Sequence, residues 1–415
     1  MGQKTRGTIA AGHIKTAEAG QIIFELGGNA FDAAIAAMLA SFVVESPLTS
    51  AAGGGFLLAH TYDNKSILFD FFCQTPRQKK PLDQLDFYPV NVNFGGATQV
   101  FHVGLGSIAV PGTLMGLFEV HQKLGSLPFS VVSEPAINYA RNGYQITPYN
   151  RFTFEILEPI LTASTESQKI YTANNTLLDV DQIGKNRDFA NFLETINQKG
   201  VQEFYQGEIG YQIERDVGQR GHLSLADLTN YRVIKRKPLK FTYRGYELLT
   251  NPPPSSGGIL MAYTLKLLEK FSFERLEWGN SDHIKLLTKV MALTNEVREK
   301  SYDQYLYQDD IIEQFLSSKN LVASQNELNQ TMNKWGSTTH ISVIDGEGNA
   351  ASVTNSNGEG SSYVIPNTGI MLNNMLGEAD LNPLGFHTWP GDRRISSMMS
   401  PTMILRDGKP EIVLG

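Results

Sequence analysis

Apolar and polar residues follow two different periods along the chain, and the switches between them mark the expected elements. The segment "GGNAFDAAIAAMLASFVVES" (27–46) is apolar on nearly every face, which predicts a buried helix. The segments "FLLAHTY" (56–62) and "SILFDFF" (66–72) flank Asp63-Asn64, and this pattern predicts a β-hairpin.

Helical periodicity dominates the middle of the chain. It predicts a helix in 113–125 and another within 130–147 that is closed by Asn142-Gly143. Residues 151–235 are expected to form a helical stretch with polar loops. The segment "YRGYELLTNPPPSSGGILMAYTLKLLEKF" (243–271) predicts a strand, a rigid Pro-Ser-Gly turn and a helix. A long amphipathic helix is expected in 282–302.

Strand patterns return in the last part of the chain. "THISVI" (339–344) and "AASVTNS" (350–356) are joined by the turn "DGEGN", and 401–415 predicts a hairpin with Asp-Gly at its tip. The sequence stops at Gly415, on the last residue of that strand, where a sheet would have a bare edge. We therefore expect a C-terminally truncated chain.

Two threonines stand between a polar segment and the first of these strands. Residues 317–337 have no apolar period and predict a mobile linker, and Thr338-Thr339 open the strand. The plain interpretation is a threonine-rich strand start. The alternative is a chain cut between Ser337 and Thr338, because a threonine with a free α-amine carries a nucleophile and a base on one residue.

The composition excludes several classes of protein. The 415 residues are 41% hydrophobic and carry a net charge of −7, which indicates a globular protein without affinity for nucleic acid. The longest apolar run, 33–44, is shorter than the roughly 20 residues that span a bilayer, so we expect no membrane partner. No signal peptide is visible, so we expect a cytoplasmic location, or a periplasmic or secreted one if a signal was trimmed. The single cysteine, Cys73, lies in an apolar strand and predicts a small buried side chain.

Familiar ligand motifs are weak or missing. "GLGSIA" (104–109) resembles a dinucleotide loop, but Pro111-Gly112 follows where a helix is required. "DGEGN" lacks the later ligands of a calcium loop, and the eight histidines show no metal-ligand spacing. We expect no metal and no cofactor.

Eight segments, in order, resemble the signatures of the γ-glutamyltranspeptidase family across essentially the whole chain. They are "ELGGNAFDAAIAA", "AAGGGFLL", "VPGTLMGLFEVHQKLG", "LADLTNYRV", "YRGYELLTNPPPSSGGI", "TTHISVIDGEGNAASVT", "GIMLNNM" and "ISSMMSPTMILRDGK". The resemblance implies an α+β fold, an αββα four-layer N-terminal-nucleophile sandwich. It also implies one precursor that cuts itself at Ser337-Thr338 into a large subunit (1–337) and a small subunit (338–415).

The resemblance also implies residue roles, position by position. Thr338 matches the nucleophile, and Thr354 and Ser356 match a T-x-T stretch whose second hydroxyl supports the nucleophile. The positions that match the binding site of a glutamyl donor are Ser396 and Ser397 for its α-carboxylate, Glu378 for its α-amine, and Asn374 with Asn373 on the same loop. Hydroxyl donors on one side and a carboxylate on the other suit a zwitterion.

Two departures weaken specificity for glutathione. Phe72 stands where glutathione-acting members have an arginine, and Met375 stands where they have a glutamine. The family's oxyanion-hole Gly-Gly pair would come after Gly415, and the loss of one such donor costs about 10²–10³ in rate.

The expected function is γ-glutamyl transfer or glutathione hydrolysis, through an acyl-Thr338 ester, to water or to an amino-acid or peptide acceptor. Three alternatives stay open: an acylase of the same fold that acts on another amide, like cephalosporin acylases; a relative that binds such ligands without turnover; and a purely structural scaffold.

Overall fold

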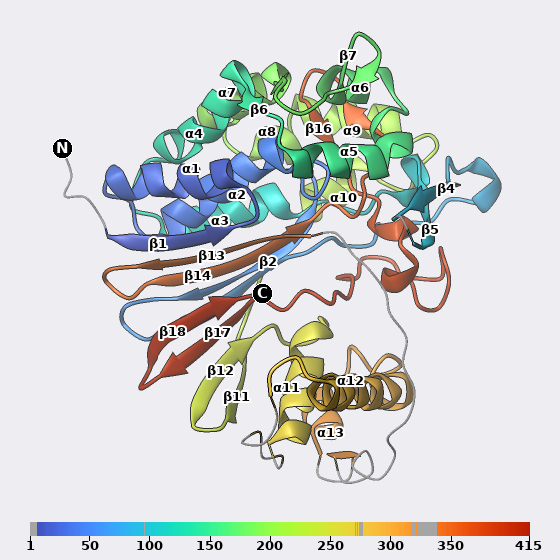
Figure 1. Cartoon of the computed structure of the whole chain (residues 1–415). Coiled ribbons are helices and arrows are strands. Elements are labelled where there is room, and N and C mark those ends of the chain that lie inside the picture. Colours follow the sequence, from blue (N-terminus) through green and yellow to red (C-terminus); the bar gives the residue numbers. More distant parts are fainter. Residues whose placement is uncertain are drawn as a thin grey trace.

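The computed structural model describes residues 6–94, 96–269, 271, 273, 277–317, 320–321 and 338–415. They build four layers: a layer of helices, a six-stranded sheet, a four-stranded sheet and a second group of helices (Figure 1). The predicted αββα architecture is confirmed by this arrangement.

The larger sheet combines strands from both ends of the chain. Its order is β1 (Gly7–Ala11), β13 (Thr339–Asp345), β14 (Ala350–Ser356), β2 (Gly54–His60), β3 (Ser66–Phe71) and β10 (Ile234–Arg236). All neighbours are antiparallel. Both predicted hairpins, β2–β3 and β13–β14, are confirmed, whereas β1 and β10 were not predicted because they are short and only partly apolar.

The smaller sheet faces the larger one across an apolar interior. Its order is β11 (Leu239–Tyr243), β12 (Tyr246–Thr250), β17 (Thr402–Arg406) and β18 (Lys409–Leu414). The Ser352 hydroxyl on β14 donates to the Leu414 carbonyl on β18 over 2.9 Å, which joins the two sheets. The predicted hairpin β17–β18 is confirmed.

The helices of the first layer cover the outer face of the larger sheet (Figure 1). They are α1 (Ile14–Glu25), α2 (Ala30–Val44), α3 (Thr113–Leu124), α4 (Phe129–Asn142), α5 (Pro148–Leu161), α6 (Thr165–Tyr171), α7 (Arg187–Lys199), α8 (Gln202–Tyr205), α9 (Glu208–Val217) and α10 (Leu225–Asn230). Helix α2 is buried along its whole length, as its composition predicts. Asn29 and Asp32 form a capping box that fixes where α2 begins.

The second helical group lies against the smaller sheet and contains α11 (Gly257–Leu268), α12 (Ser281–Ser301) and α13 (Ile311–Phe315). Small two-stranded ribbons complete the fold: β4 (Tyr88–Asn93) with β5 (Thr98–Val103), β6 (Tyr144–Gln145) with β9 (Ile183–Gly184), β7 (Thr172–Ala173) with β8 (Thr176–Leu177), and β15 (Val364–Ile365) with β16 (Ile370–Met371). Short 3₁₀ turns are η1 (Leu82–Gln84), η2 (Leu105–Ser107), η3 (Met375–Gly377) and η4 (Ala379–Leu381). Among the described residues, no helix has the length and apolar character needed to cross a membrane.

Cys73 is fully buried between the two sheets, as predicted. This burial raises the pKa of its thiol far above the usual range, so the side chain behaves as a small apolar group.

Arg394 ties the C-terminal part of the chain to the N-terminal part. Its guanidinium donates to the Tyr231 hydroxyl over 2.5 Å, to the Arg232 carbonyl over 2.7 Å and to the Phe72 carbonyl, and it lies 3.4 Å from the Asp70 carboxylate. Arg394 is only 5% exposed, so its charge is held by these partners rather than by water.

We expect Arg394→Met to lower the free energy of unfolding by about 3–5 kcal/mol, because it leaves buried acceptors without their cation. The matched control is Arg393→Met, since the exposed Arg393 side chain stacks on the Tyr307 ring; it should cost no more than about 0.5 kcal/mol. Urea unfolding followed by tryptophan fluorescence measures both, and equal effects would contradict the assignment.

Candidate active site

Thr338 directly precedes strand β13 and is exposed. Along β13 the buried residues Ile341 and Val343 face the helical layer, and the alternate residues face the second sheet. Thr338 shares its parity with His340, so a continued strand directs its side chain toward the space between the sheets. Ser337 lies outside the described residues, as does most of the predicted linker 317–337.

The pairing of β13 with β14 brings the three predicted hydroxyl residues together. Thr339 pairs with Asn355 and His340 with Thr354, so the register continued by one residue sets Thr338 opposite Ser356. Cross-strand neighbours on one face of a sheet lie about 4.5–5.5 Å apart. Thr354 and Ser356 share one face of β14, and Thr338 would join them there if the strand continued by one residue.

His340 forms hydrogen bonds with two hydroxyl groups on this face, although the sequence analysis assigned it no role. One ring nitrogen, Nδ1, lies 2.8 Å from the Thr354 hydroxyl, and the other, Nε2, lies 2.9 Å from the Ser342 hydroxyl. Burial lowers the pKa of His340 to about 4, so the ring is neutral at physiological pH. The histidine of the quoted T-T-H pattern, two residues after Thr338, was the available signal.

The end of β14 is fixed by buried hydrogen bonds. The Asn355 side chain accepts from the Thr113 hydroxyl over 2.7 Å and donates to the Thr49 hydroxyl over 2.6 Å. The Ser356 hydroxyl accepts the Gly358 N–H over 3.0 Å, which orients it at the turn after the strand. The predicted supporting hydroxyls thus stand on rigid backbone.

Asn374 and Glu378 lie against that same turn. The Asn374 side-chain oxygen accepts the N–H groups of Glu359 and Gly360 at 3.0 and 3.2 Å. Gly358 has φ +63° and no room for a Cβ, because Asn374 Oδ1 and Glu378 Oε1 would lie within 2.1 Å of it. The turn after Ser356 therefore requires glycine at this position, and two of the predicted substrate-binding residues lie against it.

The segment that contains Ser396 and Ser397 is hydrogen-bonded to another part of the chain, the turn before α11. The Ser397 carbonyl accepts from the Ser256 N–H over 2.8 Å and from the Ser255 hydroxyl over 2.7 Å, both in the turn before α11. Ser397 Oγ accepts the Met399 N–H over 3.1 Å, and Ser396 remains half-buried. The described hydrogen bonds of Ser397 thus hold this segment to the Pro-Ser-Gly turn and do not reach β13 or β14.

Phe72 and Met375, which depart from the family pattern, lie in one apolar cluster. Phe72 stacks on Phe56 with ring centroids 5.3 Å apart, and Phe56 pairs with Thr354 across the sheet. Met375 belongs to the same buried cluster between the sheets. The face that carries the hydroxyl residues is therefore bordered by apolar side chains at the two positions where the sequence analysis expected polar donor contacts.

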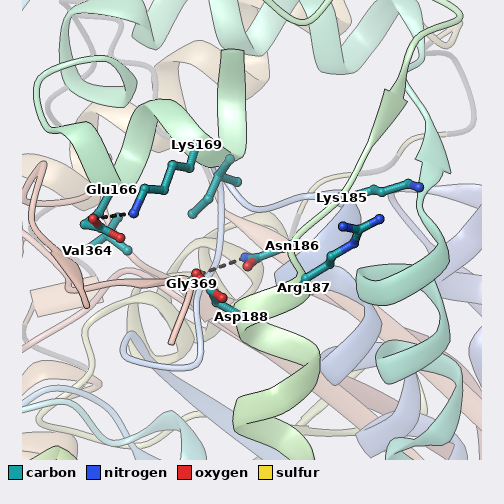
Figure 2. Close-up of a pocket in the computed structure, with 9 residues that line it drawn as sticks. Glu166, Lys169, Lys185, Asn186, Arg187, Asp188, Val364 and Gly369 are labelled. Atoms are coloured by element: carbon teal, nitrogen blue, oxygen red, sulfur yellow. Dashed lines mark hydrogen bonds and ion pairs between the residues drawn. The ribbon is translucent and has the colours of Figure 1, made fainter. Parts of the chain in front are cut away.

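A cavity of about 340 Å³ lies elsewhere, between α6, the start of α7 and the β15–β16 ribbon (Figure 2). A Glu166–Lys169 ion pair borders it, and Asn186 donates to the Gly369 carbonyl over 2.8 Å. None of the predicted site residues lines it. The described ranges also contain no cluster of three or more side chains suited to holding a metal ion.

The comparisons with known proteins agree with this arrangement. The chain belongs to the gamma-glutamyltranspeptidase family, whose model matches residues 16–415. Acylase ACY 1 proenzyme from Pseudomonas sp. (strain V22) is 28% identical over 426 residues, covering 99% of this chain and 76% of the relative. Glutathione hydrolase 2 from Arabidopsis thaliana is 30% identical over 442 residues, covering 99% of this chain and 74% of the relative.

A solved structure shares the fold. The crystal structure of cephalosporin acylase from Bacillus halodurans superposes with a TM-score of 0.84 at 24% identity, covering 99% of this chain and 77% of that chain. Family membership thus indicates an enzyme, and its relatives carry the names of both acylases and glutathione hydrolases.

The neutral state of His340 predicts a pH dependence of stability. An unfolded histidine has a pKa of about 6.5, so acid between about pH 6.5 and pH 4 protonates the unfolded chain and not His340 in the folded one. The free energy of unfolding therefore falls by at most about 1.4 kcal/mol for each pH unit of acidification.

His340→Asn should remove the part of the pH dependence of the unfolding free energy that is due to His340. Chemical denaturation of both proteins at about pH 7 and about pH 4.5 measures it, and the difference between them should shrink as the pH falls. A constant difference would contradict a neutral buried His340.

Proposed function

We propose that this chain is a self-processing amide hydrolase and acyltransferase whose nucleophile is Thr338. The observation that carries the proposal is the β13–β14 register, which starts with Thr339 opposite Asn355. Continued by one residue, this register would set Thr338 opposite Ser356 on the inter-sheet face. Membership of the family supports it, as does the proenzyme name of a relative with 28% identity. The products of processing would be a large subunit, 1–337, and a small subunit beginning at Thr338.

Processing needs only the threonine and water. The Thr338 hydroxyl attacks the Ser337 carbonyl carbon, the C–N bond breaks, and the Thr338 nitrogen leaves as an amine after taking a proton. The resulting ester is cleaved by water, which gives a carboxylate on Ser337 and a free α-amine and hydroxyl on Thr338.

Turnover uses the amine that processing has released. The Thr338 α-amine takes the proton of its own hydroxyl as the oxygen attacks the donor carbonyl, and then passes that proton to the departing amine. Water or an acceptor amine next attacks the acyl-Thr338 ester, and its proton returns to the Thr338 oxygen. Ser356, oriented by the Gly358 N–H, is placed to hydrogen-bond the nucleophile.

The donor we propose first is a γ-glutamyl amide. Asn374 and Glu378 support it, because they gather oxygen acceptors at the turn beside Ser356. A second candidate is an acyl donor without an α-carboxylate. It is favoured by Phe72, whose position offers an aromatic ring instead of a cation, and by Arg394, whose guanidinium is already engaged by Asp70 and Tyr231.

Self-cleavage distinguishes between the two threonines. Intact-mass spectrometry of the full-length protein should show two fragments that meet at Ser337/Thr338, and Thr338→Ala should stay a single chain because the attacking hydroxyl is gone. The matched control is Thr339→Val, since Thr339 is 2% exposed and its hydroxyl has no hydrogen-bond partner in the described part of the chain.

Thr339→Val should cleave like the wild type. If Thr338→Ala is cut, or if Thr339→Val is not, the assignment of Thr338 is wrong.

A panel of four p-nitroanilides separates the two donor candidates. γ-Glutamyl carries an ammonium and a carboxylate, 4-aminobutyryl only the ammonium, glutaryl only the carboxylate, and butyryl neither. Because Phe72 stands where an arginine would pair with the carboxylate, removal of the carboxylate should lower kcat/KM by less than about tenfold, whereas a bidentate arginine contact would be worth more. A loss of about 10³-fold for 4-aminobutyryl relative to γ-glutamyl would rule out the second candidate.

A further inference from the structure

A strap of seven residues, 383–389, connects two groups of predicted substrate-binding residues, with Glu378 before it and Ser396 after it. The first three residues of the strap are exposed, and Leu384 is 83% exposed. Exposed residues make few contacts with the rest of the chain. The position of the strap therefore depends on the side chains in its second half.

The second half of the strap lies against β5 and the start of β4. The Phe386 ring is 4.4 Å from the His102 ring on β5, and the His387 ring is 4.5 Å from the Phe87 ring, measured between centroids. The backbone carbonyl of His102 accepts a hydrogen bond from the Asn374 side chain over 3.4 Å. The strap thus packs on a residue that supports Asn374, one of the predicted site residues.

One hydrogen bond joins His387 to a distant part of the chain. The Lys80 N–H donates to His222 Nδ1 over 3.0 Å, and His222 Nε2 lies 3.1 Å from His387 Nδ1. A neutral imidazole carries one N–H, so a His222 ring that accepts at Nδ1 has its hydrogen on Nε2 and donates it to His387. His387 accepts at Nδ1 and is neutral as well. The two hydrogen bonds therefore fix the tautomer and the charge of both rings.

A proton added to either ring breaks this chain of hydrogen bonds. On His387 it would set two N–H groups against each other, and on His222 it would oppose the Lys80 N–H. The titratable groups that act on the pair from neighbouring segments are the ammonium groups of Lys79 and Lys80 and the ring of His102. Burial lowers the pKa of both histidines, and the Lys79 ammonium adds to this effect.

We propose that His222 and His387 form an acid-sensitive latch, which holds the strap on β5 while both rings are neutral and releases it when one ring is protonated. A released histidine has an ordinary pKa of about 6.5, whereas the latched pair resists protonation. Release therefore takes up a proton, so the latch is closed above about pH 6.5 and weakens as the pH falls below it. Release would also uncover His102 beside Asn374, which places this pH response next to the candidate site.

Nuclear magnetic resonance on the full-length protein, labelled with ¹⁵N in histidine and tryptophan, tests the latch without turnover. Ring-nitrogen shifts separate a bare nitrogen from an N–H, and both His222 and His387 should have a bare Nδ1 at about pH 7.5. The heteronuclear Overhauser effect of the Trp389 amide measures fast motion at the end of the strap. It should fall between about pH 6.5 and pH 5, in step with protonation of His387, while the His121 amide on α3 stays unchanged.

The ratio of released to latched strap should rise up to tenfold per pH unit for each proton taken up. His387→Asn separates the latch from its titration. Asparagine offers an acceptor near the position of Nδ1, suits the left-handed backbone of residue 387 (φ +60°) and cannot be protonated. The strap of this variant should stay ordered to about pH 5, because only His222 can still take a proton and its pKa is lowered to about 4. The matched control is His121→Asn, which should release the strap in acid as the wild type does.

The outcomes decide the proposal independently of the proposed function. Acid release in the wild type and in His121→Asn, but not in His387→Asn, would establish the latch. A strap that stays ordered to about pH 5 in the wild type, or acid release that persists in His387→Asn, would overturn it. A protonated Nδ1 on His222 or His387 at about pH 7.5 would also overturn it, and this measurement needs no variant.

Discussion

The antiparallel pairing of β13 with β14 is the constraint on which the candidate site depends. Side chains alternate between the two faces of a strand, so a slip of one residue would turn His340 into the helical layer and separate Thr338 from Ser356. The buried pair Ile341 and Val343 opposes such a slip, because it would lose its place against α2. Asp345, at the turn, strengthens the register: it accepts the N–H groups of Glu347 and Asn349 at 3.0 Å each.

Asp345 also connects the hairpin to the helix behind it. Its second carboxylate oxygen accepts the N–H of Ala30, the first residue of α2, over 3.0 Å. A carboxylate at a helix N-terminus is favoured by the unpaired N–H groups and the helix dipole. Strand β13, which follows Thr338, is therefore held at its far end by the fully buried helix α2. The candidate nucleophile sits at the exposed end of an anchored element.

Much of this arrangement follows from local patterns in the sequence. The hairpins at Asp63-Asn64 and "DGEGN", the buried helix α2 and the Pro-Ser-Gly turn were predicted because each depends on neighbouring residues. Strand order was not available from periodicity, and the insertion of β13 and β14 between β1 and β2 is a long-range pairing. The four-layer sandwich was predicted from the resemblance to the γ-glutamyltranspeptidase family and not from periodicity.

The candidate site likewise combines residues that local motifs predict with contacts that only the folded chain brings together. The hydroxyl residues could be named from matching motifs, but the hydrogen bond from the Glu359 N–H to the Asn374 side chain joins positions whose spacing carries no signal. The networks of His340 and Arg394 likewise depend on which faces the folded sheets bring together. Phe72 and Met375 were noted as departures, and only the structure shows that they share one apolar cluster.

The central claim, that Thr338 carries the acyl group, is tested most directly by trapping that group. The mature protein is mixed with excess γ-glutamyl or 4-aminobutyryl anilide, quenched in acid within one turnover, and its fragments are weighed and sequenced by mass spectrometry. The account predicts that the fragment beginning with Thr338 gains the mass of one acyl group, located on that first residue. An acyl group on another residue, or turnover with no acylated fragment, would contradict it.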